Sequence, residues 1–353
     1  MPNTVQVLNG KSFGTFSTFP VFDMLIKEGL YTASLTFRTK GVFPYPPGTV
    51  VCCFIATQTP FVVEEITYDS NGISEVRCIS VWEMLKRRHS GPLHPQMRVD
   101  TIQPVGYLSG FLNEINRDQN RWFVYWLEFD LRTAEYDSYT VDYDPSKSIY
   151  DYMYDAALYN QLALTSYIKT TWNNSANVSV VLGVKSLNTV DTIFDIGPLD
   201  SVTSRLTRRL PSAPTHWYIE QTKDYGFWKM ASRGRIRTWY ENRAYMQDTT
   251  DWKGVYRYES GLSGGKDREW GQITEEIRCD PLKSVVLDID EITQERFGNL
   301  TIGRPVSVVT MGVKVTGYVI ERTISGGDLT TYSVKIQPDR FYKDGEEVTD
   351  KWI

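Results

Sequence analysis

A strand pattern that occurs twice is the feature that most constrains how this chain can fold. The later copy, from Leu300 to Ile336, alternates apolar and polar residues in three successive runs, which predicts an antiparallel β-meander. Ser325 to Asp328 supplies residues that tolerate positive φ between the second and third runs, as a tight hairpin requires. The earlier copy, from Gly48 to Ser80, has its runs and its Asn71-Gly72 hairpin signal in the same order. We therefore expect a duplicated β-domain, with two unrelated β-domains as the alternative.

The two copies match in order and spacing, although few of their residues are identical. In each copy a glycine opens the first strand, the second strand ends in a charged pair, and a hairpin with glycine leads to the third strand. The charged pairs are Glu64-Glu65 and Glu321-Arg322. Because turn positions fix strand register, matching turns are hard to sustain on different folds. We expect Gly48–Ser80 to superpose on Gly303–Ile336.

Length and charge narrow the range of functions. A chain of 353 residues is long enough for two or three domains. Its net charge of -5 gives no bulk attraction to nucleic acid or to anionic membranes. The aromatic content, with 10 Trp, 22 Tyr and 15 Phe, is typical of proteins that present large contact surfaces.

The cysteines and the N-terminal residues indicate the compartment. Cys52, Cys53, Cys78 and Cys279 are interpreted as buried thiols of a reducing environment, because the first two are adjacent and cannot bridge each other without strain. The first residues have neither the basic nor the apolar part of a signal peptide, and the apolar runs are short and broken by charges. We expect no signal peptide and no transmembrane helix.

Shifts in composition divide the chain into four regions. Residues 1–97 alternate almost continuously and form a first β-barrel-like domain that ends in a short helix from Ser80 to Arg88. Residues 98–200 form an α+β middle domain. Residues 201–283 form a β-rich connecting region that could complete the earlier domains, and residues 284–353 form the second β-barrel-like domain. The predicted fold is mainly β with a smaller α+β middle region, and it has two β-barrel-like domains of similar topology.

The middle of the chain combines an aromatic strand with one long helix. Trp122–Leu131 predicts a dense aromatic strand. Ser148–Trp172 places apolar residues at helical spacing behind a serine N-cap, which predicts the long helix. A polar link is expected at Thr203–Thr215. Strands are expected at Asn177–Val184, Tyr218–Gln221, Gly226–Arg237 and Val255–Glu259.

No segment carries a convincing catalytic, cofactor or metal motif. Gly261–Asp267 has glycines like a phosphate-binding loop, but their spacing is short and an aspartate stands where a hydroxyl is needed. Asp288–Glu291 is followed by no glycine where a calcium loop requires one. None of the three histidines has a cysteine at zinc-ligand spacing, and there is no nucleophile elbow. We expect a protein that is not an enzyme and has no cofactor and no metal.

Two groups of residues remain as candidate sites. Acidic residues from Glu128 to Asp144 lie among aromatic residues, so a glycosidase-like carboxylate pair is one alternative. Arg233, Arg235 and Arg237 alternate along one predicted strand and so project from one face, with Trp239 extending the row. The row fits either a solvent-exposed face or ion pairing across a subunit interface, where Arg and Trp are favoured.

The order of these elements resembles the baseplate hub, or tail tip hub, of long-tailed bacteriophages. The likeness is strongest in the opening domain, where Ala33–Phe37 leads through a Pro/Gly turn to Gly48–Val51, then to Phe61–Ile66, a hairpin and the helix Ser80–Arg88. The strands around Gly303–Val306 are likewise similar. The resemblance is architectural and covers most of the chain, but it does not extend to single residues in the middle region.

The resemblance implies a structural virion protein at the tail tip, made in the host cytoplasm. Such a hub joins a sixfold tail tube to a threefold tip or central fibre, and two similar domains per chain of a homotrimer give six similar units around the DNA channel. The implied partners are the distal tail or tail tube protein and a tip fibre or receptor-binding protein. Neither a membrane nor specific DNA binding is implied. Two other classes remain open: a receptor- or carbohydrate-binding attachment protein that uses the aromatic middle region, and a glycoside hydrolase.

Overall fold

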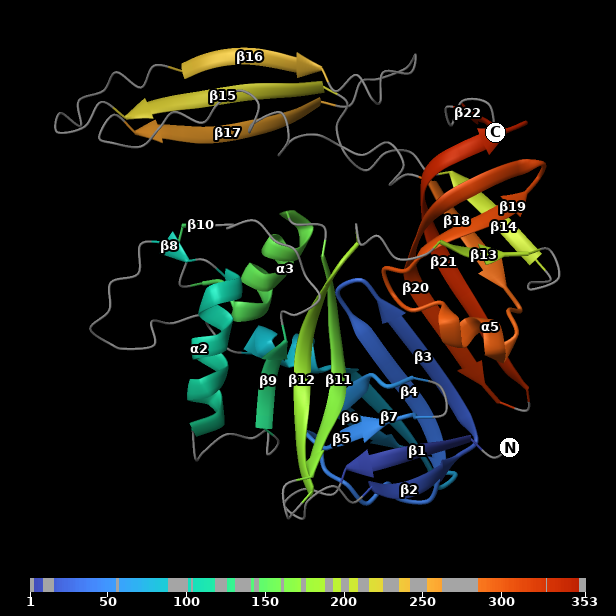
Figure 1. The fold of residues 1–353 in the computed structure, drawn as a ribbon. Coiled ribbons are helices and arrows are strands. Elements are labelled where there is room, and N and C mark those ends of the chain that lie inside the picture. Colours follow the sequence, from blue (N-terminus) through green and yellow to red (C-terminus); the bar gives the residue numbers. More distant parts are fainter. Residues whose placement is uncertain are drawn as a thin grey trace.

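A computed structural model of the protein describes residues 3–8, 16–54, 57–87, 101–102, 104–117, 126–130, 141–142, 146–159, 162–172, 176–187, 193–197, 203–208, 216–224, 235–241, 253–261, 285–327 and 329–348. Most of these residues lie in strands, and the two longest helices lie together in a smaller region (Figure 1). The fold is mainly β with a smaller α+β part, as the sequence predicts.

Fourteen strands join into one large sheet. From one edge its order is β14-β18-β21-β20-β3-β4-β7-β6-β5-β1-β2, with β19 on β20, β13 on β19 and β22 on β21. The N-terminal strands are β1 (Asn3–Leu8), β2 (Phe16–Val21), β3 (Asp23–Gly29), β4 (Ala33–Lys40), β5 (Val50–Cys52), β6 (Pro60–Tyr68) and β7 (Ile73–Ser80). The later strands are β13 (Phe194–Ile196), β14 (Thr203–Arg208), β18 (Val285–Asp290), β19 (Pro305–Thr310), β20 (Val313–Gly326), β21 (Thr330–Lys343) and β22 (Glu346–Val348), with helix α5 (Gln294–Asn299) between β18 and β19.

The large sheet contains the same five-strand unit twice. In the first unit the order is β3-β4-β7-β6-β5, and in the second unit it is β14-β18-β21-β20-β19. Neighbouring strands within each unit are antiparallel. The two units therefore have the same strand order, which confirms the predicted similarity of topology.

A glycine fixes the start of the meander in the same way in both units. Gly48, at φ 91°, donates its backbone N–H to the Val63 carbonyl at 2.7 Å, and Gly303, at φ 75°, donates to the Val319 carbonyl at 2.8 Å. Each valine N–H donates in turn to the carbonyl of the residue after the glycine, at 2.9 Å in the first unit and 3.0 Å in the second. Glycine adopts a positive φ without strain, so the two glycines that mark the repeat in the sequence have the same structural role.

A β-bulge follows at the same place in each unit. The register of β6 on β7 shifts between Val63 and Glu65, and the register of β20 on β21 shifts between Val319 and Glu321. A bulge bends its strand and increases the local twist. Before the bulge, β6 pairs with β5 and β20 pairs with β19, but beyond it neither pairing continues. The outer half of each strand is thereby released to pair with a different strand.

The second unit takes strands from outside residues 284–353. Strand β14 forms its outer edge on β18, and β13 lies parallel to β19. The prediction of a polar link at Thr203–Thr215 is therefore wrong for residues 203–208. The strand has a single apolar residue, Leu206, which packs against the core, so its alternation is too weak to be recognised in the sequence.

One hydrophobic cluster runs through both units. At its centre, Leu35 lies opposite Cys78 in the first unit, and Leu287 lies opposite Ile336 in the second. All four side chains are buried. Fully burying an aliphatic side chain contributes about 1.5–3 kcal/mol, so a shared core of this kind holds the two units together.

A smaller α+β region follows the first unit in the chain. Its helices pack on a three-stranded sheet of order β11-β12-β9, and a two-residue ladder joins β8 to β10. The elements are β8 (Thr101–Ile102), α2 (Pro104–Arg117), β9 (Trp126–Asp130), β10 (Val141–Asp142), α3 (Ile149–Tyr159), β11 (Leu162–Trp172) and β12 (Ala176–Ser186). The predicted aromatic strand thus occurs as β9, and α2 was not predicted.

The prediction of one helix from Ser148 to Trp172 is wrong in its second half. Helix α3 ends at Tyr159, and Leu162–Trp172 is strand β11, which pairs with β12 over its whole length. Leu164 and Ile168 are four residues apart, a spacing that fits both a helix face and alternate positions of a strand. Pairing with β12 decides between the two, because it provides cross-strand partners for a segment rich in threonine.

The α+β region docks on the first unit through a short helix. After β7, the chain forms α1 (Val81–Met84) and a 3-10 turn (Leu85–Arg87), where a helix was predicted, and the Ser80 hydroxyl caps it by accepting from the Glu83 N–H at 3.2 Å. The buried Trp82 donates its indole N–H to the Thr165 carbonyl of β11 at 2.7 Å. The Leu164 N–H donates to the Leu30 carbonyl at 2.7 Å. These contacts have no counterpart among the described residues after β21.

A third sheet has the order β16-β15-β17. Its strands are β15 (His216–Asp224), β16 (Arg235–Glu241) and β17 (Lys253–Gly261). They include the strands expected around Tyr218–Gln221 and Val255–Glu259, and the last residues of the one expected at Gly226–Arg237. The glycine-rich segment Gly261–Asp267 lies outside the described residues apart from Gly261.

Two properties of the described residues concern membranes and thiols. None of the helices in the described ranges is long and apolar enough to cross a membrane. Cys52, Cys53 and Cys78 are buried free thiols, and burial raises the pKa of both Cys52 and Cys78. Cys279 lies outside the described residues.

We expect Gly317→Ala to destabilise the protein by about 1–3 kcal/mol, a typical cost of overpacking. A Cβ atom at Gly317 would lie 2.1 Å from the Gln337 carbonyl oxygen of β21, so paired backbone would have to move. Gly298→Ala is the control, because nothing lies within 4 Å of its added Cβ and alanine favours a helix by about 1 kcal/mol. Denaturant unfolding measures both variants, and an unchanged midpoint for Gly317→Ala would contradict this close approach.

Candidate assembly interface

The two units are joined by strand pairing between β20 and β3. Glu321–Gly326 of β20 pair antiparallel with Met24–Gly29 of β3. This pairing uses the part of β20 that lies beyond its bulge. It turns two five-strand units into one continuous sheet, in which β3 and β20 lie side by side (Figure 1).

A buried ion pair lies at this joint. Arg322 Nη1 is 3.0 Å from Glu28 Oε2, and the two side chains are only 9% and 6% exposed. The hydroxyls of Thr57 and Thr59 donate to Glu28 Oε1, so both carboxylate oxygens have partners. A protein interior tolerates charges when they are paired and hydrogen-bonded in this way.

The Arg322 guanidinium has further partners on α5. Its Nη2 donates to the Phe297 carbonyl at 3.3 Å, and its central carbon lies 4.3 Å from the centre of the Phe297 ring, a cation–π distance. Burial lowers the pKa of Arg322, and the nearby Glu28 carboxylate opposes this effect. The joint is thus held by backbone pairing, by the ion pair and by packing on α5.

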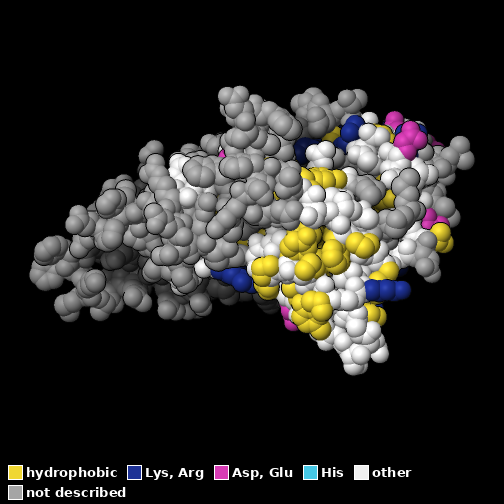
Figure 2. Space-filling view, turned by 90° about the horizontal axis from the view of Figure 1, so that it is seen from below, with side chains coloured by type: hydrophobic (Ala, Val, Ile, Leu, Met, Phe, Trp, Pro, Cys, Tyr) yellow, Lys and Arg dark blue, Asp and Glu magenta, His cyan; other side chains and the backbone are white. Residues whose placement is uncertain are grey.

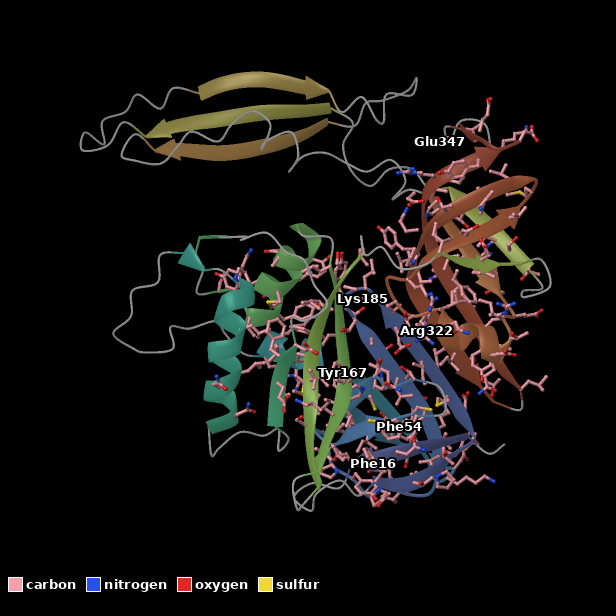
Figure 3. All side chains as sticks on the ribbon, in the orientation of Figure 1. Phe16, Phe54, Tyr167, Lys185, Arg322 and Glu347 are labelled. Carbon is pink, nitrogen blue, oxygen red and sulfur yellow. The ribbon has the colours of Figure 1, made fainter. Side chains whose placement is uncertain are left out.

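A cavity of about 500 Å³ opens beside the joint. It is lined by Glu28 and Arg322 together with Tyr167 of β11 and Lys185 of β12, and Figure 3 labels the last three. Lys185 Nζ donates to the Ile302 carbonyl at 3.4 Å, and the Tyr167 hydroxyl donates to Asp130. These polar lining residues have partners within the chain, and we assign the cavity no ligand.

Ion pairs cross between strands on the face of the sheet turned away from the core. They are Arg38–Glu75 at 2.9 Å, Arg77–Glu65 at 3.4 Å, Lys335–Glu321 at 2.6 Å and Arg205–Asp288 at 3.4 Å. The second and third occupy equivalent positions just beyond the two bulges. The Asp288 side chain is only 13% exposed, whereas the other three pairs are more exposed and contribute only about 0–1 kcal/mol each. Their main effect is to balance charge across this face.

Each unit has one edge without a partner strand among the described residues. Strand β14 is one end of the sheet, with β2 at the other, and it pairs only with β18. Glu65–Tyr68 of β6, beyond the bulge, pair only with β7, although the equivalent residues of β20 also pair with β3. Open edges of this kind present backbone N–H and C=O groups to an incoming strand.

The arginine row that the sequence suggests as a subunit interface lies in the third sheet. Arg235 and Arg237 are on β16, where they pair with Thr222 and Glu220 of β15, and Trp239 follows on the same strand. Alternate residues share one face of a strand, so these three share a face. Arg233 lies outside the described residues. A role of the row in assembly stays a prediction.

Two of the acidic residues considered for catalysis, Glu128 and Asp130, have partners in the structure. Glu128 forms an ion pair with Lys169, whose Nζ lies 2.8 Å away, and Asp130 accepts a hydrogen bond from the Tyr167 hydroxyl at 2.7 Å. Asp137 and Asp144 lie outside the described residues. Within the described ranges, no group of three or more His, Cys, Asp and Glu side chains could hold a metal ion.

Solved structures of tail proteins, two of them from prophages, share this architecture. The tail protein from Neisseria meningitidis MC58 has a TM-score of 0.60 at 11% identity, with 95% of this chain and 96% of that chain covered. The prophage MuSo2 tail protein from Shewanella oneidensis has a TM-score of 0.58 at 11% identity, with 94% and 98% covered. A prophage tail protein from Listeria monocytogenes EGD-e has a TM-score of 0.52 at 10% identity, with 94% of each chain covered. No protein-family model matches the sequence, and no curated protein is similar to it in sequence.

The chain therefore has the fold of phage tail proteins. The match covers nearly the full length of each chain, so it includes the two five-strand units and the regions between them. The resemblance inferred from the sequence is confirmed at the level of the fold.

We expect Arg322→Met to destabilise the protein by about 3–5 kcal/mol, because it leaves the Glu28 carboxylate as an uncompensated buried charge. Adding Glu28→Gln should recover part of this loss, because the unpaired charge is then removed. Lys335→Met is the control, since breaking an exposed ion pair costs about 0–1 kcal/mol. Denaturant unfolding measures all three variants. Equal losses for Arg322→Met and Lys335→Met would show that the joint does not depend on its ion pair.

Proposed function

We propose that the protein is the hub at the tail tip of a long-tailed bacteriophage, a structural virion protein that assembles as a homotrimer. It joins the sixfold tail tube to a threefold tip or central fibre and encloses part of the DNA channel. The observation that carries this proposal is the five-strand unit that occurs twice in one chain. Three chains present six similar units, so one ring can match both sixfold and threefold neighbours.

The large sheet forms the wall of the channel in this proposal. Its polar face, with ion pairs such as Arg38–Glu75 and Lys335–Glu321, is turned toward the lumen. Cations that already have acidic partners on neighbouring strands provide no surplus of positive charge for DNA phosphates. DNA can then move along the wall without being held at many points.

The partners are the distal tail or tail tube protein on one side and a tip fibre or receptor-binding protein on the other. Hydrophobic side chains gather in several groups on the end of the molecule seen in Figure 2. Phe22 and Phe54 are among the large hydrophobic side chains that are exposed. Grouped apolar side chains of this kind are typical of contact surfaces. The protein is made in the host cytoplasm and acts in the virion, and its role requires no catalysis.

We expect light scattering of the full-length protein to report a trimer. The double variant Arg235→Glu, Arg237→Glu should raise the concentration needed for assembly about tenfold or more, because like charges across an interface repel. Lys314→Glu, Lys343→Glu is the matched control, with two exposed lysines reversed outside β16. A protein that stays monomeric at every concentration would contradict the trimer. Normal assembly of the double arginine variant would contradict only the role of the arginine row.

We expect the triple variant Glu65→Lys, Glu75→Lys, Glu321→Lys to bind double-stranded DNA at least about tenfold more tightly than the wild type at low salt, because it makes the proposed wall basic. The binding should weaken steeply as salt is raised, since bound cations are released from DNA. Glu291→Lys, Glu295→Lys, Glu346→Lys adds the same charge at exposed positions elsewhere and serves as the control. Mobility-shift titration compares the proteins, and equal binding by both variants would contradict the placement of this face in the lumen.

A further inference from the structure

We propose that neighbouring copies of the chain join by strand pairing between Glu65–Tyr68 of β6 in one copy and β14 in the next. The inference rests on the proposed trimer and specifies how it closes. Its template is the β20–β3 joint within the chain, where equivalent strands already pair. Each copy offers one β6 edge and one β14 edge, and a head-to-tail contact between different edges closes into a ring.

The outer half of β6 corresponds to the outer half of β20. Glu65 follows the bulge of β6 and lies opposite Arg77, and Glu321 follows the bulge of β20 and lies opposite Lys335. Continuing along both strands, Tyr68 in the first unit corresponds to Ile324 in the second. In the second unit this stretch pairs with β3. In the first unit it has no such partner among the described residues.

Strand β14 corresponds to β3. Ile26 of β3 lies opposite Leu35, and Leu206 of β14 lies opposite Leu287. Leu35 and Leu287 are themselves equivalent, because Leu35 lies opposite Cys78 of β7 and Leu287 lies opposite Ile336 of β21. Cys78 and Ile336 occupy the same position in their units, since they pair with Val63 and Val319, just before the two bulges. The strand that β20 joins within the chain thus has its counterpart at the open end of the sheet.

Transferring the register of the β20–β3 joint predicts the contacts between copies. Ile324 lies opposite Ile26 in the existing joint, so Tyr68 would lie opposite Leu206. One step to either side, Asp69 would lie opposite Arg205 and Thr67 opposite Thr207. The register therefore brings an apolar residue to an apolar residue and an acid to a base. Such pairs across strands each contribute about 0.2–1 kcal/mol.

The exposure of Tyr68 supports the same conclusion. Ile324 is 1% exposed, because β3 covers it, whereas the equivalent Tyr68 is 54% exposed. Leu206 is only partly buried, whereas the equivalent Ile26 is fully buried. Tyr68 and Leu206 are therefore both more exposed than Ile324 and Ile26, their counterparts in the β20–β3 joint. A strand from a second copy covers both at once.

Charge is also complementary between the two edges. The outer part of β6 and the residue after it include Asp69 and Glu65, which is paired with Arg77, while β14 includes Arg205, which is paired with Asp288. Opposite charges across a contact favour this partner and disfavour pairing of two identical edges. A second copy of the chain is therefore the occupant that fits.

The double variant Thr67→Cys, Thr207→Cys tests the pairing. Residues directly opposite each other in antiparallel strands have Cα atoms about 4.5–5.5 Å apart, within the range for a disulfide. Mild oxidation should therefore link the copies, and non-reducing electrophoresis should show a covalently closed trimer. Each single variant should stay monomeric on the gel, because residues 67 and 207 lie on different edges.

Two controls make the result decisive. Lys27→Cys, Thr323→Cys places cysteines at the equivalent positions of the β20–β3 joint and should form a disulfide within one chain. Thr67→Cys, Ser204→Cys is three residues out of register, about 10 Å along the strand, and should not crosslink. If the in-register variant fails to crosslink while the intrachain control is oxidised and scattering shows a trimer, the strand pairing is overturned and the proposed function stands. Crosslinking of the out-of-register variant to the same extent overturns the register, and a protein that is only monomeric overturns the trimer and the pairing together.

Discussion

The backbone groups along an open sheet edge need partners, and this constraint organises the whole molecule. Within the chain it is met at the β20–β3 joint. A bulge after Val319 releases the outer half of β20 from β19, and β3 takes the vacant side. From this one pairing come the continuous sheet, the core that both units share and the cavity beside Arg322. The same constraint leaves β14 and the outer half of β6 as open edges of the two five-strand units in the part of the chain that the structure describes.

The two units differ at one position that decides whether β3 pairs with β20 or with β6. The position held by Arg322 in the second unit is held by Ile66 in the first. Glu28 of β3 is satisfied by Arg322, and it would be left as a buried charge beside Ile66. An unpaired buried charge costs several kcal/mol, so the ion pair directs β3 to β20 of its own chain rather than to β6 of another. Its contribution is therefore to specificity more than to net stability.

How much could be predicted from the sequence depends on how local the signals are. Gly48, Gly303 and Asn71-Gly72 fix turns within a few residues, so the repeat and its strand order could be predicted. Strand β14 could not be predicted because Leu206 is its only apolar residue, and β11 could not be told from a helix because its apolar residues fit both periods. The Glu28–Arg322 pair joins residues 294 positions apart, and no local pattern marks it. The two candidate edges, β14 and the outer half of β6, could not be predicted from the sequence either, because whether a strand has a neighbour depends on the sheet order and not on its own residues.

The α+β region breaks the equivalence of the two units. It docks on the first unit through the buried Trp82 and its hydrogen bond to the Thr165 carbonyl of β11, whereas its contact with the second unit includes the hydrogen bond from Lys185 to the Ile302 carbonyl. In the proposed trimer, the five-strand unit therefore repeats six times in a similar form, whereas the docked region repeats three times. A sixfold neighbour can contact the repeated units, and a threefold neighbour can contact what occurs once per chain. A single chain can therefore connect a sixfold neighbour to a threefold neighbour if it contains the five-strand unit twice and the α+β region once.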